Sequence, residues 1–576
     1  MKLNKKVISF FLSMMLIISV FLLPATGSEN EEKQNRVFTS SWSQLTTADS
    51  GFPSPFTFYP RGDGYIMMSY CFDTLIWPDE NGEFIGLLAD SWESSADGIE
   101  WTFYLRENVT WHDGEPFTAN DVVFTINYMK EKAHVSPVGS SWYNTAIIDN
   151  VKAPDDHTVI ITLKQPYAPF MQLVLDVIPI MPEHIWKDVS DPSTYMEEDA
   201  VVGTGPFILE DYDKEQKSYK YSANKDYFLG EPVIDTLIYV QTSDPILSLK
   251  TGEVDESSLS FDQVQALSDQ DNLKVISGPG YHVYRLRFNI PSNAILNDTD
   301  VRKAIYYSLD CEDIMSRVLH GGGVVGNPGY VPPYSKWYYP GVTKYAYDPE
   351  KANQMLDDAG YQNKDTDGIR IDPDGNRLEF QLLYPTEQQS QRLAELIQTY
   401  FKEVGIGIIL KPGDRMTVDG LVGSGNFEMA IYTHATATEP GNMLNSFPTS
   451  TGWNNSEFMS LATEQMVTMD EEKRKELVDR MQVLIADNVP TIPVFYRDMY
   501  SACNQEKFDG FFYTPEGIAG GIPVEYNKLA FIYGNWNGES TEATEDTSTN
   551  SADSIGIFGS VAVLASAFLL RKYSQS

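Results

Sequence analysis

The feature that most constrains the fold is a pair of strand-like segments that lie far apart in the chain. The first is YHVYRLRFNIP (residues 281–291) and the second is PTIPVFYRDMYSAC (490–503). The sequence between them alternates helix and strand patterns. A lobe built from this insertion would be joined to the rest of the chain by two crossing connections, as a hinge between lobes requires. We therefore predict two lobes hinged by two crossing strands.

The insertion itself has the pattern of a mixed α/β lobe. TDVRKAIYYSLDCEDIMSRVLH (299–320) predicts a helix with Asp300 as its N-cap, because apolar residues recur at helical spacing after it. EQQSQRLAELIQTYFKEVGI (387–406) predicts a second helix that ends at Gly405. Strand-like segments precede and follow this second helix. The β-α-β order predicts an α/β fold class.

Two stretches of the insertion match ligand-binding motifs only in part. HGGGVVGN (320–327) has the GxGxxG spacing, but it follows a helix pattern instead of a strand, so a dinucleotide site is excluded. DTDGIRIDPDGN (365–376) has the acids of a calcium loop, but Ile369 and Arg370 stand where an EF-hand needs a ligand and a glycine. We predict a solvated acidic hairpin there, with incidental calcium binding as the alternative.

Cysteine content and net charge exclude further classes of protein. Cys71, Cys311 and Cys503 are widely spaced, which favours neither a disulfide framework nor a metal site. The formal net charge of −39 would repel a phosphate backbone, so nucleic acid is excluded as a partner. We predict no metal site and no cofactor.

The two ends of the chain have patterns of export and anchoring. Residues 1–27 combine early lysines with an apolar run, as a secretory signal peptide does. Residues 537–554 are rich in Ser, Thr and acids, which predicts an extended linker. Residues 555–570 are uncharged and precede Arg571 and Lys572, which predicts a transmembrane helix that tethers the protein to the outer face of the cell membrane. A buried core helix and a sorting signal removed after export are the alternatives.

A histidine and an aspartate stand side by side in LRENVTWHDGEPFTANDVVFT (105–125). The segment has a strand pattern, a Gly/Pro turn and then a helix start, where Thr118 and Asp121 are spaced as in a capping box. His112 and Asp113 therefore fall in a strand-to-helix turn. We interpret them as structural, and a catalytic dyad is the alternative.

Several motifs resemble one known family when they are taken together. Besides the segment around His112, these are GTGPF, GEVD, VRKAIYYSLD, YDPEKANQMLDDAGY and VGIGI. Their order is similar to that of the extracellular solute-binding proteins of ABC importers, family 5, the oligopeptide-, dipeptide- and nickel-binding group. The resemblance implies a two-lobed periplasmic-binding-protein-like fold of type II, class C, with an extra subdomain. It covers nearly the whole chain up to about residue 500.

The resemblance and the end patterns together imply a domain plan. We expect a signal peptide (1–27), a first lobe (28–284) with a smaller subdomain near 70–190, a second lobe (285–492), a return to the first lobe (493–536), a linker (537–554), a transmembrane anchor (555–570) and a basic cytoplasmic tail (571–576).

The resemblance also implies a function without catalysis. Such a protein captures a solute, most often a peptide, between its lobes and delivers it to the permease subunits of an ABC importer and their ATPase. We expect a monomer that is not an enzyme and has no catalytic residues. Three alternatives stay open at this point: an oligosaccharide ligand on the same scaffold, a sensory ectodomain that does not transport, and a secreted hydrolase.

The resemblance further points to candidate ligand contacts. In peptide-binding members an aspartate pairs with the peptide ammonium. The similar segment here is THATATEPGNML (433–444), in which Thr436 takes the place of that aspartate and Glu439 takes the place of an acid further along the motif. Either Glu439 substitutes for the aspartate, or the ligand has no ammonium, or Glu439 is a solvated loop acid.

The resemblance also points to aromatic contacts. SPVGSSWY (136–143) is similar to the segment that presents an aromatic to the ligand, which makes Trp142 the first candidate. The weaker candidates, for which core packing is the alternative, are Tyr143, Trp453 and Phe56.

Overall fold

The computed structural model describes residues 35–41, 49–59, 63–267, 269–435, 438–515, 517–518 and 527–538. All of them belong to one structural unit. The predicted signal peptide, most of the predicted linker, the predicted C-terminal anchor and the basic tail fall outside the described residues.

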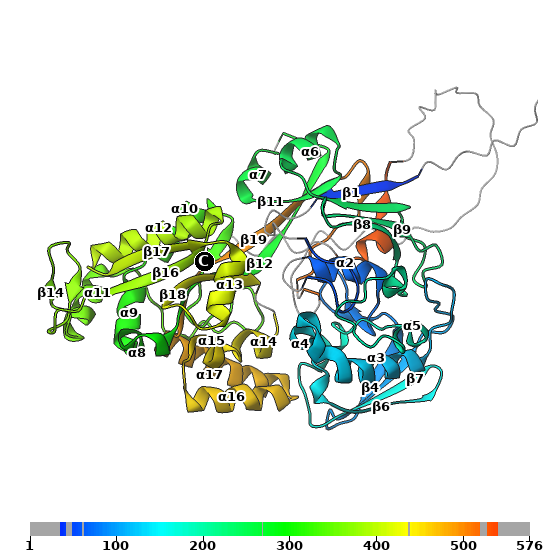
Figure 1. Cartoon of the computed structure of the whole chain (residues 1–576), viewed down its shortest axis with the longest axis horizontal. Helices are drawn as coiled ribbons and strands as arrows, with labels where there is room; N and C mark the ends of the chain where they lie inside the picture. Colours follow the sequence, from blue (N-terminus) through cyan, green and yellow to red (C-terminus); the bar gives the residue numbers. More distant parts are fainter. Residues whose placement is uncertain are drawn as a thin grey trace, which may run out of the picture. The chain divides into compact units, whose positions relative to one another are not determined.

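One large mixed sheet runs through the described part of the chain (Figure 1). It has eleven strands there, in the order β17 (Gly407–Gly413), β16 (Glu379–Pro385), β18 (Met429–Ala435), β12 (Leu273–Phe288), β19 (Thr491–Asn504), β11 (Glu256–Leu259), β1 (Val37–Ser41), β10 (Thr236–Val240), β9 (Ser218–Ala223) and β8 (Phe207–Asp213), with β13 (Gly323–Val325) beside β19.

Strands β12 and β19 are the crossing connections expected from the sequence. Residues 273–278 of β12 pair with 499–504, and residues 282–287 pair with 491–497, so both strands pass from one lobe into the other. The register shifts between Gly278 and His282. At this point a Cβ added to Gly280 would lie 1.8 Å from the carbonyl oxygen of Arg497. The hinge by two crossing strands is therefore confirmed, and the close approach of the two backbones requires a glycine.

The first lobe is built on a core of residues from both ends of the described chain. Phe38 near its start packs edge-on against Phe508 and Phe531 near its end, with ring centroids 5.3 and 5.7 Å apart. A separate sheet in the order β4 (Ala89–Ser94), β5 (Glu100–Leu105), β7 (Thr158–Leu163) and β6 (Ile148–Asp155) lies beside helix α3 (Ala119–Lys132), as Figure 1 shows. The Thr118–Asp121 capping box at the start of α3 is present as predicted.

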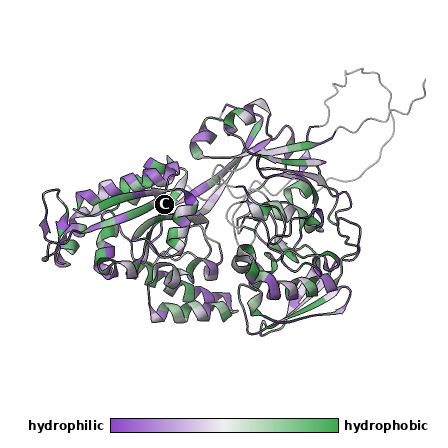
Figure 2. Ribbon diagram, viewed as in Figure 1, coloured by the Kyte–Doolittle hydropathy of each residue, from purple (hydrophilic) through white to green (hydrophobic). Residues whose placement is uncertain are grey.

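The second lobe has its own core around β12, β16 and β18. Its helices are α8 (Ala294–Asn297), α9 (Thr299–Tyr307), α10 (Cys311–Leu319), α11 (Pro349–Asp358), α12 (Gln388–Glu403), α13 (Arg415–Gly423), α14 (Pro440–Leu444), α15 (Phe447–Thr451), α16 (Ser456–Val467) and α17 (Glu471–Asn488). Figure 2 shows hydrophobic colour along the strands and hydrophilic colour on the outer sides of helices such as α12.

Local predictions for this lobe are confirmed at one helix and wrong at another. Helix α12 is followed by Gly405 at a φ of 84°, as a C-terminal glycine should be. The single helix expected over residues 299–320 is instead two helices, α9 and α10. Asp298, not Asp300, caps α9 by accepting a hydrogen bond from the amide of Asp300, and Asp310 caps α10. Asp310 starts a new helix because its side chain accepts from the amide of Asp313.

The remaining elements are short. The strands are β2 (Ile76–Pro78), β3 (Phe84–Gly86), β14 (Asn363–Lys364), β15 (Arg370–Ile371), β20 (Phe508–Asp509) and β21 (Asn535–Trp536). The helices are α2 (Gly64–Cys71), η1 (Ala133–Val135), α4 (Pro137–Trp142), η2 (Thr145–Ile147), η3 (Met171–Leu175), α5 (Glu183–Trp186), η4 (Glu198–Val201), α6 (Pro245–Thr251), α7 (Phe261–Gln265), η5 (Ile290–Ser292) and α18 (Ala530–Tyr533). The acidic segment 365–376 forms the turns that follow β14 and β15, with Asp365 and Asp372 accepting hydrogen bonds from nearby backbone amides.

The expected membrane tether has to be corrected. Within the described residues no helix is both long and apolar enough to cross a bilayer. The segment on which the expectation depended, 555–570, lies outside the described residues. The location on the outer face of a membrane, held by a C-terminal transmembrane helix, is therefore withdrawn. All three cysteines are free thiols, with Cys71 and Cys503 buried.

Candidate functional site

The carboxyl ends of parallel strands in an α/β sheet are where ligands bind most often. In the second lobe, β16 pairs in parallel with both β17 and β18, so these three strands end at one edge of the sheet. Polar side chains gather there: the Arg415 guanidinium pairs with the carboxylate of Glu387 and donates to Thr433 Oγ1 at 2.8 Å. Tyr284 donates to Gln389 Oε1 at 2.5 Å beside them. This edge is the candidate surface of the second lobe.

The first lobe touches the second through the segment around η3. The Gln172 side chain donates to Thr438 Oγ1 at 2.6 Å, and the amide of Ala168 donates to the carbonyl of Met466 at 2.8 Å. Near the crossing strands, His320 of the second lobe lies 2.7 Å from the carboxylate of Asp262 of the first. Residues of both lobes and of β19 also line a small hollow at this point: Leu259, Ser260, Phe261, Asp262, Val318, Leu319, Gly322, Gln389, Arg497, Asp498 and Tyr500.

Trp142, the first candidate from the sequence, lies at the end of α4 in the first lobe and is half-buried. Its ring is stacked on that of Tyr65, with centroids 5.1 Å apart and an interplanar angle of 8°. Phe58 meets the same indole edge-on at 5.7 Å. The Tyr65 hydroxyl donates to the carbonyls of Asp176 and Val177, and burial raises the pKa of this phenol well above its usual value. The three rings form a rigid aromatic platform.

The weaker aromatic candidates are buried inside the two cores. Tyr143 donates from its hydroxyl to the carbonyl of Pro55 at 2.5 Å and packs edge-on against Phe56. Phe56 is 1% exposed. Trp453 belongs to the core of the second lobe, where it packs on Phe458 with centroids 5.0 Å apart. The structure thus places Phe56 and Tyr143 with Trp142 in the first lobe and Trp453 in the other.

Glu439, the candidate partner of a ligand ammonium, is 1% exposed and is already used within the protein. It caps α14 by accepting from the amides of Gly441 at 2.6 Å and Asn442 at 3.2 Å. Its carboxylate also forms an ion pair with the buried guanidinium of Arg474. It is therefore not the solvated loop acid that was one alternative. Thr436 lies outside the described residues.

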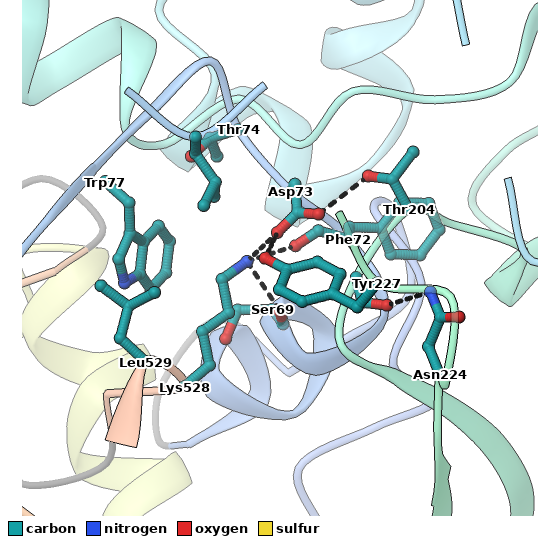
Figure 3. Close-up of polar contacts among 12 residues, drawn as sticks. Ser69, Phe72, Asp73, Thr74, Trp77, Thr204, Asn224, Tyr227, Lys528 and Leu529 are labelled. Carbon is teal, nitrogen blue, oxygen red and sulfur yellow. Dashed lines mark hydrogen bonds and ion pairs between the residues drawn. The ribbon is translucent and has the colours of Figure 1, made fainter. Parts of the chain in front are cut away.

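A buried ion pair that sequence analysis missed lies in the first lobe (Figure 3). The Lys528 ammonium is 2.5 Å from the carboxylate of Asp73, and both side chains are fully buried. Thr204 donates to Asp73 at 3.0 Å and Tyr227 donates to it at 3.2 Å. Lys528 further donates to the carbonyls of Ser69 and Phe72. No local pattern could reveal this pair, because 455 positions separate its members.

The Asp73–Lys528 pair fastens the returning chain to the first lobe. The Lys528 ammonium also lies over the ring of Trp77, 4.5 Å from the centroid, and Asn527 accepts a hydrogen bond from the Trp77 indole at 2.9 Å. Burial lowers the pKa of Lys528, while Asp73 acts to raise it. The Lys528 ammonium is thus stabilised by the Asp73 carboxylate, two backbone carbonyls and the face of the Trp77 ring.

His112 and Asp113 do not face each other in the turn that the sequence predicted. His112 Nε2 lies 3.0 Å from the carbonyl oxygen of Gly205, and His112 Nδ1 accepts from the amide of Gly203 at 3.3 Å. Asp113 instead contacts His184, at 2.8 Å. Burial lowers the pKa of His112, which favours the neutral ring that these two backbone contacts require. The two contacts of His112 join the turn to segment 203–205.

Sequence comparison identifies the family. Residues 83–455 match Bacterial extracellular solute-binding proteins, family 5 Middle. The oligopeptide-binding protein AppA of Bacillus subtilis is 28% identical over 426 residues, which covers 70% of this chain and 76% of AppA. The dipeptide-binding protein of Escherichia coli is 28% identical over 472 residues, which covers 76% of this chain and 85% of that protein.

Solved structures share the fold. AppA of Bacillus subtilis in complex with a nonapeptide has a TM-score of 0.71 at 23% identity, covering 87% of this chain and 98% of that chain. A mannohexaose-bound periplasmic oligopeptide-binding protein of Thermotoga maritima has a TM-score of 0.73 at 20% identity, covering 88% and 100%. NikZ of Campylobacter jejuni with Ni(L-His) has a TM-score of 0.71 at 23% identity, covering 84% and 97%. The two-lobed fold and the matched residues together show that this chain belongs to the bacterial extracellular solute-binding proteins of family 5.

Proposed function

We propose that this protein is the ligand-capturing component of an ABC importer and that its ligand is a peptide. The observation that carries the proposal is its membership of family 5, combined with relatives named for oligopeptide and dipeptide binding. A structural neighbour holds a nonapeptide within the same two-lobed fold. The protein then acts by binding and release, without a chemical step, and hands the peptide to permease subunits driven by an ATPase.

Capture depends on two lobes that touch the same ligand. The lobes are joined through β12 and β19, and their facing segments already meet at Gln172–Thr438 and Ala168–Met466. A ligand stabilises one arrangement of the lobes only by binding it more tightly than the other, and a shift from 1:99 to 99:1 takes about 5.5 kcal/mol. The polar edge around Arg415 and the aromatic platform around Trp142 would supply contacts from the two sides.

Trp142 is the aromatic contact that the geometry favours. It is half-buried and held flat by Tyr65, so it loses little conformational freedom when a ligand packs against it. Phe56, Tyr143 and Trp453 would act by packing behind the site, because they are buried. Thr436 remains a proposed contact. The Glu439 carboxylate is balanced by Arg474, so it is a weak partner for a ligand ammonium.

An oligosaccharide is the second candidate ligand. The Thermotoga maritima neighbour is bound to mannohexaose, and the flat indole of Trp142, supported by the buried ring of Tyr65, suits the apolar face of a sugar ring. The internal use of Glu439 also favours a ligand that carries no ammonium.

Ligand identification decides between the two candidates. Native mass spectrometry of the purified chain should reveal a co-purifying mass, and calorimetric titration should then give tight binding with peptides and none with neutral oligosaccharides of similar length. Small-angle scattering should show a smaller radius of gyration with the bound peptide. If only oligosaccharides bind, the ligand is an oligosaccharide and not a peptide. If neither peptides nor oligosaccharides bind and the radius of gyration does not change, the proposal is overturned.

A further inference from the structure

Aromatic rings and guanidinium groups alternate on one side of β12 in the second lobe. The Arg285 guanidinium carbon lies 5.2 Å from the ring centroid of Tyr330 and 5.4 Å from that of Tyr432. The Arg287 guanidinium carbon lies 5.2 Å from Tyr432 and 5.4 Å from Phe427. The two arginines are two residues apart on the strand, so they project from the same face.

Both arginines are buried and lack an acidic partner among the described residues. Arg285 is 4% exposed and Arg287 is 8% exposed. Among the described residues no carboxylate forms an ion pair with either one, and the charges that act on the pKa of Arg287 come from Arg285, Tyr432 and Tyr330. Burial and the neighbouring Arg285 charge lower the pKa of Arg287 to about 10, so it still carries its charge at neutral pH. Two buried like charges therefore lie side by side.

The other buried arginines of the described chain differ from Arg285 and Arg287 because fixed acceptors bind their guanidinium groups. Arg302 donates to the carbonyls of Leu296, Asn488 and Val489 and to the Thr299 hydroxyl. Arg370 pairs with Asp357 and donates to backbone carbonyls and to Asn353. Arg474 pairs with Glu439 and donates to Gln465. Each of these guanidinium groups is saturated by fixed acceptors, as a purely structural buried arginine should be.

The pair on β12 keeps unused donors. Arg285 Nε is buried with no hydrogen-bond partner among the described residues. The Tyr330 hydroxyl is also buried and makes no well-aligned hydrogen bond there, but it lies close enough to Arg285 for that guanidinium to act against the rise that burial causes in the pKa of Tyr330. Arg287 donates from Nε to the carbonyl of Ser450 at 2.7 Å and also from Nη2. Aromatic rings occupy the faces of a guanidinium, whereas its N–H groups point outward in its plane. The stack therefore leaves the in-plane donors of Arg285 available.

Tyr330 is held in an unusual backbone conformation beside this stack. Its φ is 74°, in the left-handed region that residues other than glycine rarely adopt. Tyr496 donates to its carbonyl, and Phe447 packs edge-on against its ring at 4.8 Å. Residues that the surrounding structure holds in rare backbone conformations cluster at functional sites. Here the strain places a phenol hydroxyl next to a guanidinium, in a site to which no described residue contributes an anion.

We propose that Arg285 and Arg287, together with the Tyr330 hydroxyl, form a binding site for one small oxyanion, a carboxylate or sulfate. The oxyanion accepts from the free N–H edge of Arg285 and from Tyr330, and it offsets the repulsion between the two guanidinium groups. The partly exposed Tyr432, Phe427 and Ser450 form the side from which it enters. Two sources supply this chemistry: a free anion, or an acidic group on the bound ligand.

The first experiment needs no knowledge of the ligand. Sodium sulfate is titrated calorimetrically into the full chain and into the Arg285→Met and Arg392→Met variants, at constant ionic strength. Arg392 is exposed on α12, so its variant removes the same charge away from the site. Loss of a charge-assisted hydrogen bond should weaken sulfate binding by about 10- to 100-fold in Arg285→Met, with no change in Arg392→Met. No saturable sulfate binding to the wild-type chain, together with no acid preference in the peptide comparison below, overturns the proposal.

The second experiment tests the ligand as the source, and this arm alone rests on the proposed function. The affinity of Ala-Glu-Ala is compared with that of Ala-Gln-Ala, which has nearly the same shape without the charge. A preference for the glutamate peptide that disappears in Arg285→Met, and that sulfate competes away, places the ligand's acid at this site. Sulfate binding without any peptide preference identifies a free anion as the occupant. If neither peptide binds and native mass spectrometry finds no co-purifying peptide, the proposed peptide ligand fails, while the sulfate result still decides the site.

A milder variant guards against misfolding. Tyr330→Phe keeps the ring, its stack on Arg285 and its contact with Phe447, and it removes only the hydroxyl. Sulfate affinity should fall by a few-fold, roughly the effect of one neutral hydrogen bond. Circular dichroism spectra that match the wild-type protein confirm that each variant is folded. Unchanged sulfate affinity in both Tyr330→Phe and a folded Arg285→Met would show that sulfate binds elsewhere.

Discussion

Glu439 and Arg474 form a buried ion pair in the second lobe, in which the carboxylate also caps helix α14. Removal of one partner leaves the other charge buried and uncompensated. Glu439→Gln should therefore lower the free energy of unfolding by about 3–5 kcal/mol, as is typical when a buried pair is broken. Urea unfolding measures this loss. Glu457→Gln, which breaks the exposed pair with Arg480, is the matched control and should cause no measurable loss.

The Glu439–Arg474 pair also predicts how N-terminal acetylation of a peptide ligand changes its affinity for the protein. Because Arg474 already balances Glu439, this carboxylate adds little to the binding of a free amino group. Acetylated and free forms of one peptide should differ in affinity by less than about tenfold, or about 1.4 kcal/mol. Calorimetric titration of both forms measures the ratio. A loss of about a thousandfold on acetylation would show that a carboxylate does receive the ammonium.

The Asp73–Lys528 pair should be essential for the attachment of the returning chain. Lys528→Met leaves the Asp73 carboxylate buried without its cation, so the free energy of unfolding should fall by about 3–5 kcal/mol. The double variant Lys528→Met with Asp73→Asn removes both charges and should recover most of this loss. Chemical denaturation of the three proteins measures the cycle. A double variant no more stable than Lys528→Met would mean that packing, not the unpaired charge, is responsible.

Stability should depend on pH through His112. Burial depresses the pKa of this ring below the value of 6.5 that it has when unfolded, so the unfolded chain takes up a proton first as the pH falls. The contribution of neutral His112 to the free energy of unfolding is therefore present above pH 6.5 and is lost as the pH falls toward the pKa of His112 in the folded protein. Protonation also removes the acceptor Nδ1 that holds the amide of Gly203. Urea midpoints between pH 7.5 and 5.5 should fall in the wild-type protein and flatten in His112→Gln, whereas His157→Gln, at an exposed site, should follow the wild type.

Gly280 should tolerate no side chain. An added methyl group would lie 1.8 Å from the carbonyl oxygen of Arg497, so one of the crossing strands has to move. Gly280→Ala should cost about 1–3 kcal/mol, the usual range for overpacking. Gly420→Ala is the matched control: this glycine is in helix α13 with nothing within 4 Å of an added Cβ, so alanine should stabilise by about 0.5–1 kcal/mol. Equal midpoints for Gly280→Ala and the wild type would contradict the close approach.

Trp142 should contribute to ligand binding more than to folding. Trp142→Leu removes the ring that is stacked on Tyr65. The affinity for the ligand should fall by about 30-fold, the effect of losing an aromatic contact worth about 2 kcal/mol. Trp536→Leu, in the returning segment next to Lys507, should leave affinity unchanged. Titration of the identified ligand into each variant measures the effect. Equal affinities for Trp142→Leu and the wild type would place the ligand elsewhere.

The sequence by itself determined those features that depend on neighbouring residues or on motif order. The Thr118–Asp121 capping box, the glycine that ends α12 and the strand character of 281–291 and 490–503 follow from local periodicity and caps, which act within a few residues. The ordered motifs predicted the family and its two-lobed fold, and the comparisons confirmed both. Where two caps competed nearby, at Asp298 and Asp310, the local pattern was insufficient, and one expected helix proved to be two.

Only the tertiary structure decided which charged groups are paired and which aromatic rings are buried. Asp73 and Lys528 stand 455 positions apart, and Glu439 meets Arg474 from another helix. Arg285 and Arg287 look like ordinary polar residues of an alternating strand until packing buries them between rings. The physical reason is that burial and pairing depend on which distant segments the two cores bring together, and a one-dimensional pattern contains no such distances.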